Sequence, residues 1–179
     1  MKVALAAALL LAIGCTSTVS SRPTVPPPVS AGGSSASSGG VGVPPRGAQP
    51  VEGGCGRTLL YKSGELPGWA LVNAPTFLPY AVAAPGTAVG YLFSYPLVAG
   101  PAGNKILWYV GIPRDGQPLV GQGHPVGASS PVATFSKPPD SGPGEIFPSG
   151  VAVPAPGCWH LTLNWGGGQR QAEIDLAFE

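Results

Sequence analysis

Short runs in which apolar and polar residues alternate recur through the C-terminal two thirds of this 179-residue chain. Successive side chains of a β-strand point to opposite faces, so this alternation is typical of strands that bury one face. The clearest runs are 89–95, 106–112, 158–165 and 172–178. The chain has 28 Gly and 23 Pro, and those between the runs mark turns. Because helical periodicity is absent from this region, the pattern predicts an all-β fold.

The last two runs predict a hairpin. The triplet Gly166-Gly167-Gly168 lies between them, and glycine readily adopts the positive φ angles of hairpin turns. In 158–165, Trp159 shares an apolar face with every second residue after it, whereas Cys158 and His160 fall on the polar face. We therefore expect the two runs to pair as antiparallel strands, with Cys158 outside the core.

Shorter strands are expected around 70–72, 118–120 and 132–135. Many short strands separated by turns are typical of a sandwich or a barrel. We expect residues 54–179 to form an immunoglobulin-like β-sandwich of about seven strands, with a small β-barrel as the alternative. A segment of this length is able to bury a hydrophobic core.

The N-terminus has the pattern of an export signal. Lys2 supplies a positive charge, 3–13 is an unbroken apolar run, and the small residue Gly14 precedes Cys15. These parts together are typical of a secretory signal peptide. A helix over the apolar run reaches only about 16 Å, which is short of a hydrocarbon core of about 30 Å. The sequence thus predicts a signal peptide over 1–14 rather than a transmembrane anchor.

The sequence Ala12-Ile13-Gly14-Cys15 resembles the lipobox of bacterial lipoproteins, although that family usually has Leu where this chain has Ala12. The resemblance implies a thioether-linked lipid on Cys15, cleavage before this residue, and acylation of the new amino terminus, for example with palmitate. Several acyl chains hold a protein at a bilayer far better than one, since each buried methylene contributes about 0.8 kcal/mol. The chain is therefore expected at the extracytoplasmic face of the cell membrane, anchored through Cys15.

Residues 15–53 have the composition of a disordered linker. Clusters of Ser, Gly and Pro such as 26–28 and 32–35 recur, whereas aromatic residues, Leu and Ile are absent. Such a segment cannot bury enough apolar area to offset the entropy of ordering. All Trp, Tyr and Phe lie at or after Tyr61, which agrees with a folded domain that begins near residue 54.

The chain has three cysteines, and lipidation of Cys15 would leave Cys55 and Cys158. Two cysteines in an exported protein usually pair. A disulfide would close a loop of roughly 100 residues and stabilise the fold by at most about 4–5 kcal/mol in chain-entropy terms. Because Cys158 lies on the polar face of its run, we expect the bond to hold Cys55 against the outside of a sheet. Two free thiols are the alternative.

Four short motifs resemble uncharacterised bacterial surface lipoproteins that have a C-terminal immunoglobulin-like domain. They are Lys105-Ile106-Leu107-Trp108, Phe147-Pro148-Ser149, Pro156-Gly157-Cys158-Trp159 and Leu161-Thr162-Leu163. The resemblance extends over about 69–179 and implies the fold and the location at the cell surface. It implies no enzymatic activity.

Charged residues make up 9% of the chain and the net charge is +1, with no cluster of Lys or Arg. Binding to nucleic acid, or electrostatically to anionic lipid headgroups, depends on clustered cations, so the composition excludes both classes. No Gly-x-Ser-x-Gly nucleophile motif and no metal-ligand pair at short Cys or His spacing occurs. We therefore assign no catalytic residue, metal ligand or cofactor from the sequence.

Two residues are candidates for ligand contact. His124 lies in the segment 121–130, whose small and polar residues suggest a binding loop. Trp69 could present an aromatic platform to a glycan, and core packing is its alternative role. The sequence thus predicts a non-catalytic binding or interaction module of the cell envelope, with wall glycan or an envelope protein as partner. The alternative is an exported metal-binding protein or hydrolase that uses His124, His160 and Cys158.

Overall fold

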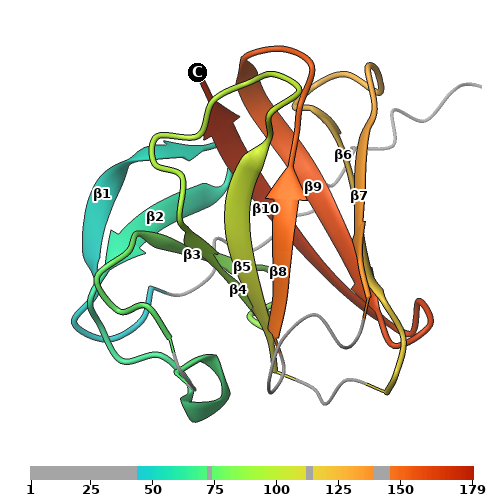
Figure 1. The fold of residues 1–179 in the computed structure, drawn as a ribbon. Coiled ribbons are helices and arrows are strands. Elements are labelled where there is room, and N and C mark those ends of the chain that lie inside the picture. The colour runs from blue at the N-terminus through green and yellow to red at the C-terminus, as the bar shows by residue number, and fades with distance from the viewer. Residues whose placement is uncertain (1–43, 72–73, 112–114, 139–145) are drawn as a thin grey trace, which may run out of the picture. The chain divides into compact units, whose positions relative to one another are not determined.

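The computed structural model describes residues 44–71, 74–111, 115–138 and 146–179 (Figure 1). The signal peptide expected over 1–14, Cys15 and most of the expected linker lie outside the described residues. Within these ranges the chain consists of strands and turns, as the alternating runs predicted, with one short 3₁₀ helix, η1, Gly68–Ala70.

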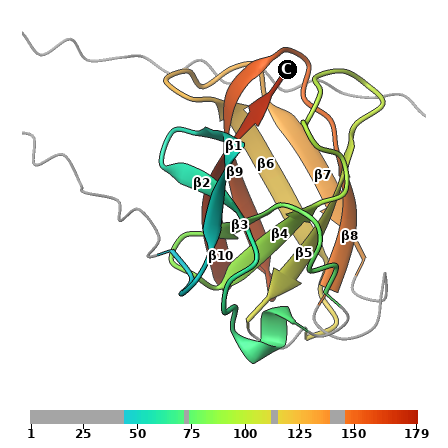
Figure 2. The same cartoon turned by 90° about the vertical axis from the view of Figure 1, so that its left-hand side faces the viewer.

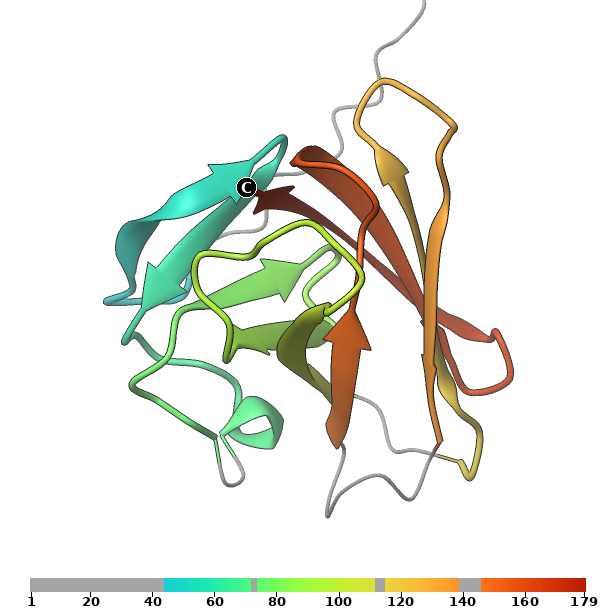
Figure 3. The ribbon, with the colours of Figure 1, turned by 45° about the horizontal axis from the view of Figure 1, so that its top comes forward.

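Ten strands are described, and each runs antiparallel to its neighbours. They are β1 Gln49–Cys55, β2 Thr58–Lys62, β3 Tyr80–Ala83, β4 Ala88–Leu92, β5 Asn104–Val110, β6 Leu119–Pro125, β7 Ala133–Lys137, β8 Ile146–Val151, β9 Gly157–Trp165 and β10 Arg170–Phe178. They form one continuous sheet in the order β7-β6-β9-β10-β1-β2-β3-β4-β5-β8. The sheet folds over, so that β3, β4, β5 and β8 face β6, β7, β9 and β10 across a shared hydrophobic core (Figures 1 and 3). The prediction of an all-β, sandwich-like fold is therefore confirmed.

The number of strands and the start of the first strand differ from the prediction. Ten strands are described where about seven were expected, and β1 begins at Gln49, within the segment expected to be linker. No alternation marks β1, and most of its residues are exposed. It is a strand because residues 49–51 pair with residues 60–62 of β2 (Figure 2). The strand expected over 70–72 is also wrong at its two described residues, because Ala70 ends η1 and Leu71 is the C-cap of this helix; residue 72 lies outside the described residues.

The hairpin predicted from the last two alternating runs is confirmed as β9 and β10. The register pairs Trp165 with Arg170 across the turn 166–169, and the three glycines of this turn all have positive φ. Alternate residues of β9 from Trp159 onward are buried, whereas Cys158 and the residues that share its face are half-buried.

The prediction of a loop over 121–130 is wrong for its first half, because β6 extends to Pro125. A Cβ at Gly121 would overlap the ring of Phe135 from β7, and a Cβ at Gly123 would overlap the side chain of Leu161 from β9. These glycines are strand residues whose missing side chains make room for their neighbours. The glycine content of this segment thus reflects packing in the core.

The strand expected over 89–95 ends at Leu92. The N–H groups of Phe93 and of the next residue both donate to the carbonyl of Lys105, which interrupts the regular ladder. Phe93 and Tyr95 therefore lie beyond β4, and each is 40% exposed rather than packed on one buried face.

Two stacked aromatic rings join the two halves of the folded sheet. Trp108 of β5 and Phe135 of β7 have ring planes within 10° of parallel and centroids 6.5 Å apart. Each ring also covers a glycine of a neighbouring strand, Gly90 of β4 for Trp108 and Gly121 of β6 for Phe135. Glycine lets a bulky ring approach the backbone of the adjacent strand closely. These four residues help to set the separation of the two halves.

A second hydrophobic cluster lies on the outer face of β2 to β5. Its buried members are Tyr61, Leu66, Ala70, Tyr80, Val89, Tyr91, Leu107, Tyr109 and Ile146. The segment between β2 and β3, which includes η1, covers this face (Figure 2). The hydroxyl of Tyr91 donates to the Ala70 carbonyl at 2.9 Å, and that of Tyr80 donates to the Ser63 carbonyl at 2.7 Å. Both hydrogen bonds tie the covering segment to the sheet.

Burial raises the pKa values of Tyr80, Tyr91 and Tyr109 above the ordinary value of 10.0. Neighbouring tyrosines add to this increase in pKa for Tyr80 and Tyr91. The hydroxyls of Tyr80 and Tyr91 therefore remain protonated over the whole neutral range, which keeps their hydrogen bonds to the covering segment intact.

Replacing Gly90 by Ala is expected to destabilise the fold by about 1–3 kcal/mol, because the new methyl group would overlap the buried indole of Trp108. Gly150 of β8 is the matched control, because it is also a strand glycine but has open space where a Cβ would lie. Gly150→Ala should be neutral or stabilise by less than about 1 kcal/mol. Urea unfolding of both variants measures the difference, and equal stabilities would contradict the packing described.

Candidate functional site

The outer face of β6, β9 and β10 carries polar side chains in rows across the strands. The register pairs His124 of β6 with His160 of β9, and His160 with Asp175 of β10. The next row holds Gln122, Thr162 and Glu173. The chain has two histidines, and the fold places both of them in one row. The row of His124, His160 and Asp175 is the candidate functional site.

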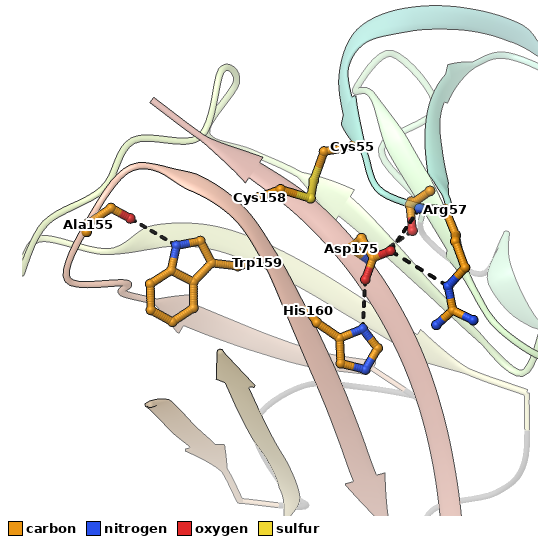
Figure 4. The surroundings of a disulfide bond; sticks show 8 residues. Cys55, Arg57, Ala155, Cys158, Trp159, His160 and Asp175 are labelled. Atoms are coloured by element: carbon orange, nitrogen blue, oxygen red, sulfur yellow. Dashed lines mark hydrogen bonds and ion pairs between the residues drawn. A yellow bond between two sulfur atoms is a disulfide. The ribbon is translucent and has the colours of Figure 1, made fainter. Parts of the chain in front are cut away.

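Asp175 is the most connected residue of this row, although its side chain is only 6% exposed. Its carboxylate accepts hydrogen bonds from the backbone N–H of Arg57 at 2.8 Å and from Nδ1 of His160 at 2.7 Å (Figure 4). A buried carboxylate needs such donors to replace the water that it loses. The Asp175 N–H donates to Oγ1 of Thr58 at 2.8 Å, away from β9. Asp175 and His160 thus form a non-hydrogen-bonded strand pair, in which facing side chains lie closest.

Arg57 reaches Asp175 from the turn between β1 and β2. Gly56 and Arg57 are the two residues of this turn, and Gly56 has a φ of +54°, which favours glycine. A Cβ at Gly56 would also overlap the Asp175 carboxylate, so both the turn and the contact require glycine. The Arg57 guanidinium lies 3.6 Å from Oε2 of Glu173 and 3.9 Å from Oδ2 of Asp175.

The predicted disulfide between Cys55 and Cys158 is confirmed, and it lies close to Asp175 (Figure 4). Cys158 is paired with Ala177 of β10, and β1 follows on the other side of β10. Strands on either side of a third lie about 9–10 Å apart in a flat sheet, whereas the two cysteine Cα atoms are 5.8 Å apart. The end of β1 therefore leans over the outer face of β10. The bond holds the turn that contains Arg57 against this face.

The hydrogen bonds of the two histidines indicate which ring nitrogen carries the proton. Nδ1 of His160 faces the Asp175 carboxylate, and Nδ1 of His124 lies 3.0 Å from the carbonyl oxygen of Pro125. Carboxylate and carbonyl oxygens only accept hydrogen bonds, so Nδ1 is the donor in both rings. In the neutral rings each Nε2 then keeps its lone pair. The two ring centroids are 5.4 Å apart.

In a serine-hydrolase triad, a histidine is held by a buried carboxylate and also contacts a nucleophile. In the described ranges no nucleophile contacts His160. There, His160 has polar contacts with Asp175 and Glu173, and neither is a hydroxyl or a thiol. Cys158 is in a disulfide and cannot act as a thiolate. The hollow beside Arg57 and Asp175 has a volume of about 20 Å³, which is room for a single water molecule.

The trio His124, His160 and Cys158 was the predicted alternative for a metal or hydrolase site. The fold brings the two histidines together, and the disulfide removes the thiol. In the part of the chain that the structure describes, no group of three or more His, Cys, Asp or Glu side chains is arranged to hold a metal ion. Nε2 of His160 lies 4.0 Å from Oε2 of Glu173.

Asp175 and Arg57 were not predicted as site residues. A signal for Asp175 is present in the hairpin, because it lies as far after the glycine turn as His160 lies before it. Counting outward from this turn pairs the two residues on the polar face. No comparable signal exists for Arg57, because the strand that positions it shows no alternation.

Trp69, predicted as a ligand contact, lies in η1 and packs against the second hydrophobic cluster. Its indole covers Gly111, where a Cβ would lie 2.9 Å from the ring. Phe77, in the same covering segment, is 77% exposed. Ligand contact by Trp69 stays a prediction, and its packing against Gly111 is a structural role.

No helix among the described residues is both long and apolar enough to cross a lipid bilayer. No family model, curated protein or solved structure matches this chain. The function must therefore be inferred from the residues of the chain itself.

Replacing Asp175 by Asn is expected to move the proton of His160 from Nδ1 to Nε2. The single amide oxygen would accept from the Arg57 N–H, and the amide NH₂ would then donate to Nδ1 of His160. Long-range ¹⁵N–¹H NMR spectra at about pH 8, where imidazole is ordinarily neutral, distinguish the two tautomers. His124 is the internal control, because its Pro125 contact is unchanged. The same His160 tautomer in both proteins would contradict the arrangement described.

Proposed function

We propose that the protein is an extracytoplasmic lipoprotein, anchored in the cell membrane through lipid on Cys15, whose β-sandwich is a non-catalytic binding module of the cell envelope. Wall glycan or an envelope protein is the proposed partner. The proposed linker would place the module about 30–40 Å from the lipid, given the usual scaling of flexible chains.

The disulfide between Cys55 and Cys158 is the observation that carries this proposal. Disulfides form and persist in oxidising compartments outside the cytoplasm. The bond accounts for two of the three cysteines, and the remaining one, Cys15, follows an unbroken apolar run. This position is the one at which a lipoprotein is lipidated, which supports export and anchoring through the same residue.

The polar face of β6, β9 and β10 supports binding rather than catalysis. Its side chains offer hydrogen-bond donors and acceptors on three paired strands, which hold them in fixed positions. Rigid arrays of this kind are suited to recognising the hydroxyl and amide groups of a glycan or of another protein. Within the described ranges the polar contacts of His160 are with the carboxylates of Asp175 and Glu173, and the hollow beside Asp175 has room for a single water molecule.

Radioactive or clickable palmitate should label the full chain expressed in a bacterial host, and the labelled protein should fractionate with membranes. Cys15→Ala should abolish the label, because that sulfur is the proposed attachment point. The double variant Cys55→Ala with Cys158→Ala is the matched control, since it also loses cysteines but should keep the label. Incorporation of palmitate into the Cys15→Ala protein would sink the proposed anchor.

The full chain, kept in detergent so that its lipid is masked, should sediment with purified cell-wall sacculi, and soluble glycan fragments should compete. Trp69→Ala tests the predicted contact, and Phe77→Ala is the control from the same segment. Thermal unfolding of Trp69→Ala separates lost contact from lost packing against Gly111. If the protein stays in the supernatant, wall glycan is not the partner, and cross-linking on cells would identify a protein partner instead.

A further inference from the structure

We propose that His124 and His160 form a binding site for a divalent late transition-metal ion, of which Zn²⁺ and Cu²⁺ are the best matches. Nε2 of each ring is the proposed ligand atom. This proposal does not depend on lipid anchoring or on binding to the envelope.

The separation of the two rings fits a shared ion. Zn–N distances of about 2.0–2.1 Å and a tetrahedral angle place the centroids of two coordinated imidazoles about 5 Å apart. The centroids of His124 and His160 are 5.4 Å apart in the structure. The two residues face each other on adjacent strands, so the backbone of the sheet maintains this spacing.

The second hydrogen bond of each ring fits a metal ligand as well. A metal-binding histidine almost always donates its other ring N–H to a carboxylate or a backbone carbonyl, which fixes the tautomer and the ring orientation. Here Nδ1 of His160 donates to Asp175, and Nδ1 of His124 donates to the Pro125 carbonyl. Both Nε2 lone pairs are thereby available for an ion.

The charge next to the pair favours a cation. Glu173 and Asp175 contribute two carboxylates, against the single guanidinium of Arg57. Asp175 orients the ring of His160 through its contact with Nδ1. Oε2 of Glu173 instead lies 4.0 Å from Nε2, the proposed ligand atom. The Glu173 side chain is 39% exposed, and it would provide a third ligand if it left the guanidinium of Arg57 and the side-chain amide of Gln171. Water would complete the coordination.

The ligand chemistry selects the ion. Imidazole suits zinc, copper and nickel better than the hard cations Mg²⁺ and Ca²⁺, and Cu²⁺ binds most tightly among the divalent first-row ions. Because the chain has two histidines and both belong to this pair, Cu²⁺ is a specific probe of the site.

The test is a Cu²⁺ titration of the full chain in detergent, purified without a histidine tag and stripped of metal with a chelator. We expect one tightly bound Cu²⁺ per chain by calorimetry, and an electron paramagnetic resonance spectrum with nitrogen coupling from two imidazoles. His124→Gln should weaken binding at least about tenfold and leave coupling from one imidazole. Asp175→Asn should weaken binding about 10–100-fold, because it would place a proton on Nε2 of His160.

Asn164→Ala is the matched control, because Asn164 lies on the same face of β9 two residues beyond Thr162 and should not affect affinity. Thermal unfolding checks each variant, and His124→Gln keeps the test valid if Asp175→Asn does not fold, because His124 has no contact with the buried carboxylate. Binding of fewer than one Cu²⁺ per chain, or equal affinity in the wild type and in His124→Gln, would overturn the proposal.

Discussion

The stack of Trp108 on Phe135 is the interaction on which the arrangement of this fold depends. With charged residues at 9% of the chain, few polar interactions are available to hold two halves of a sheet together. The two rings bridge the halves, and each fits against its own half only because Gly90 or Gly121 lies beneath it. Bulky rings in places left by glycine give a dense core from short strands.

The packing of this core determines the geometry of the polar face. A slip of one residue between β9 and β10 would turn Trp159 and Leu161 outward and His160 inward, at the cost of several buried side chains. The buried face therefore fixes the register that pairs His160 with Asp175 and with His124. The site is an arrangement of surface side chains whose positions are determined by the apolar residues on the opposite face of the same strands.

How much of this was predictable depended on whether an element carries its own pattern. β9 and β10 alternate strictly around a glycine triplet, and both the hairpin and the outward position of Cys158 were predicted correctly. β1 has no pattern, since it is a strand through its pairing with β2 and β10, and Arg57 was missed with it. Gly121 in β6 was misread as part of a loop because its reason, the ring of Phe135, comes from another strand. Local patterns thus predicted the β9–β10 hairpin that carries His160. The position of Arg57 depends on contacts between distant parts of the chain, which no local pattern shows.

The disulfide determines what chemistry the polar face is able to offer. Cys158 shares the outer face of β9 with His160, so a reduced chain would have a thiol next to the imidazole pair. Thiolate is a soft ligand that would change both the preferred metal and the redox behaviour of the face. Once Cys158 is bonded to Cys55, the available donors are imidazole nitrogens and carboxylate oxygens, and the turn with Arg57 is held beside them. The compartment in which the chain folds would therefore decide the chemistry of its site, which connects the proposed export of the protein to the proposed binding of a borderline metal ion.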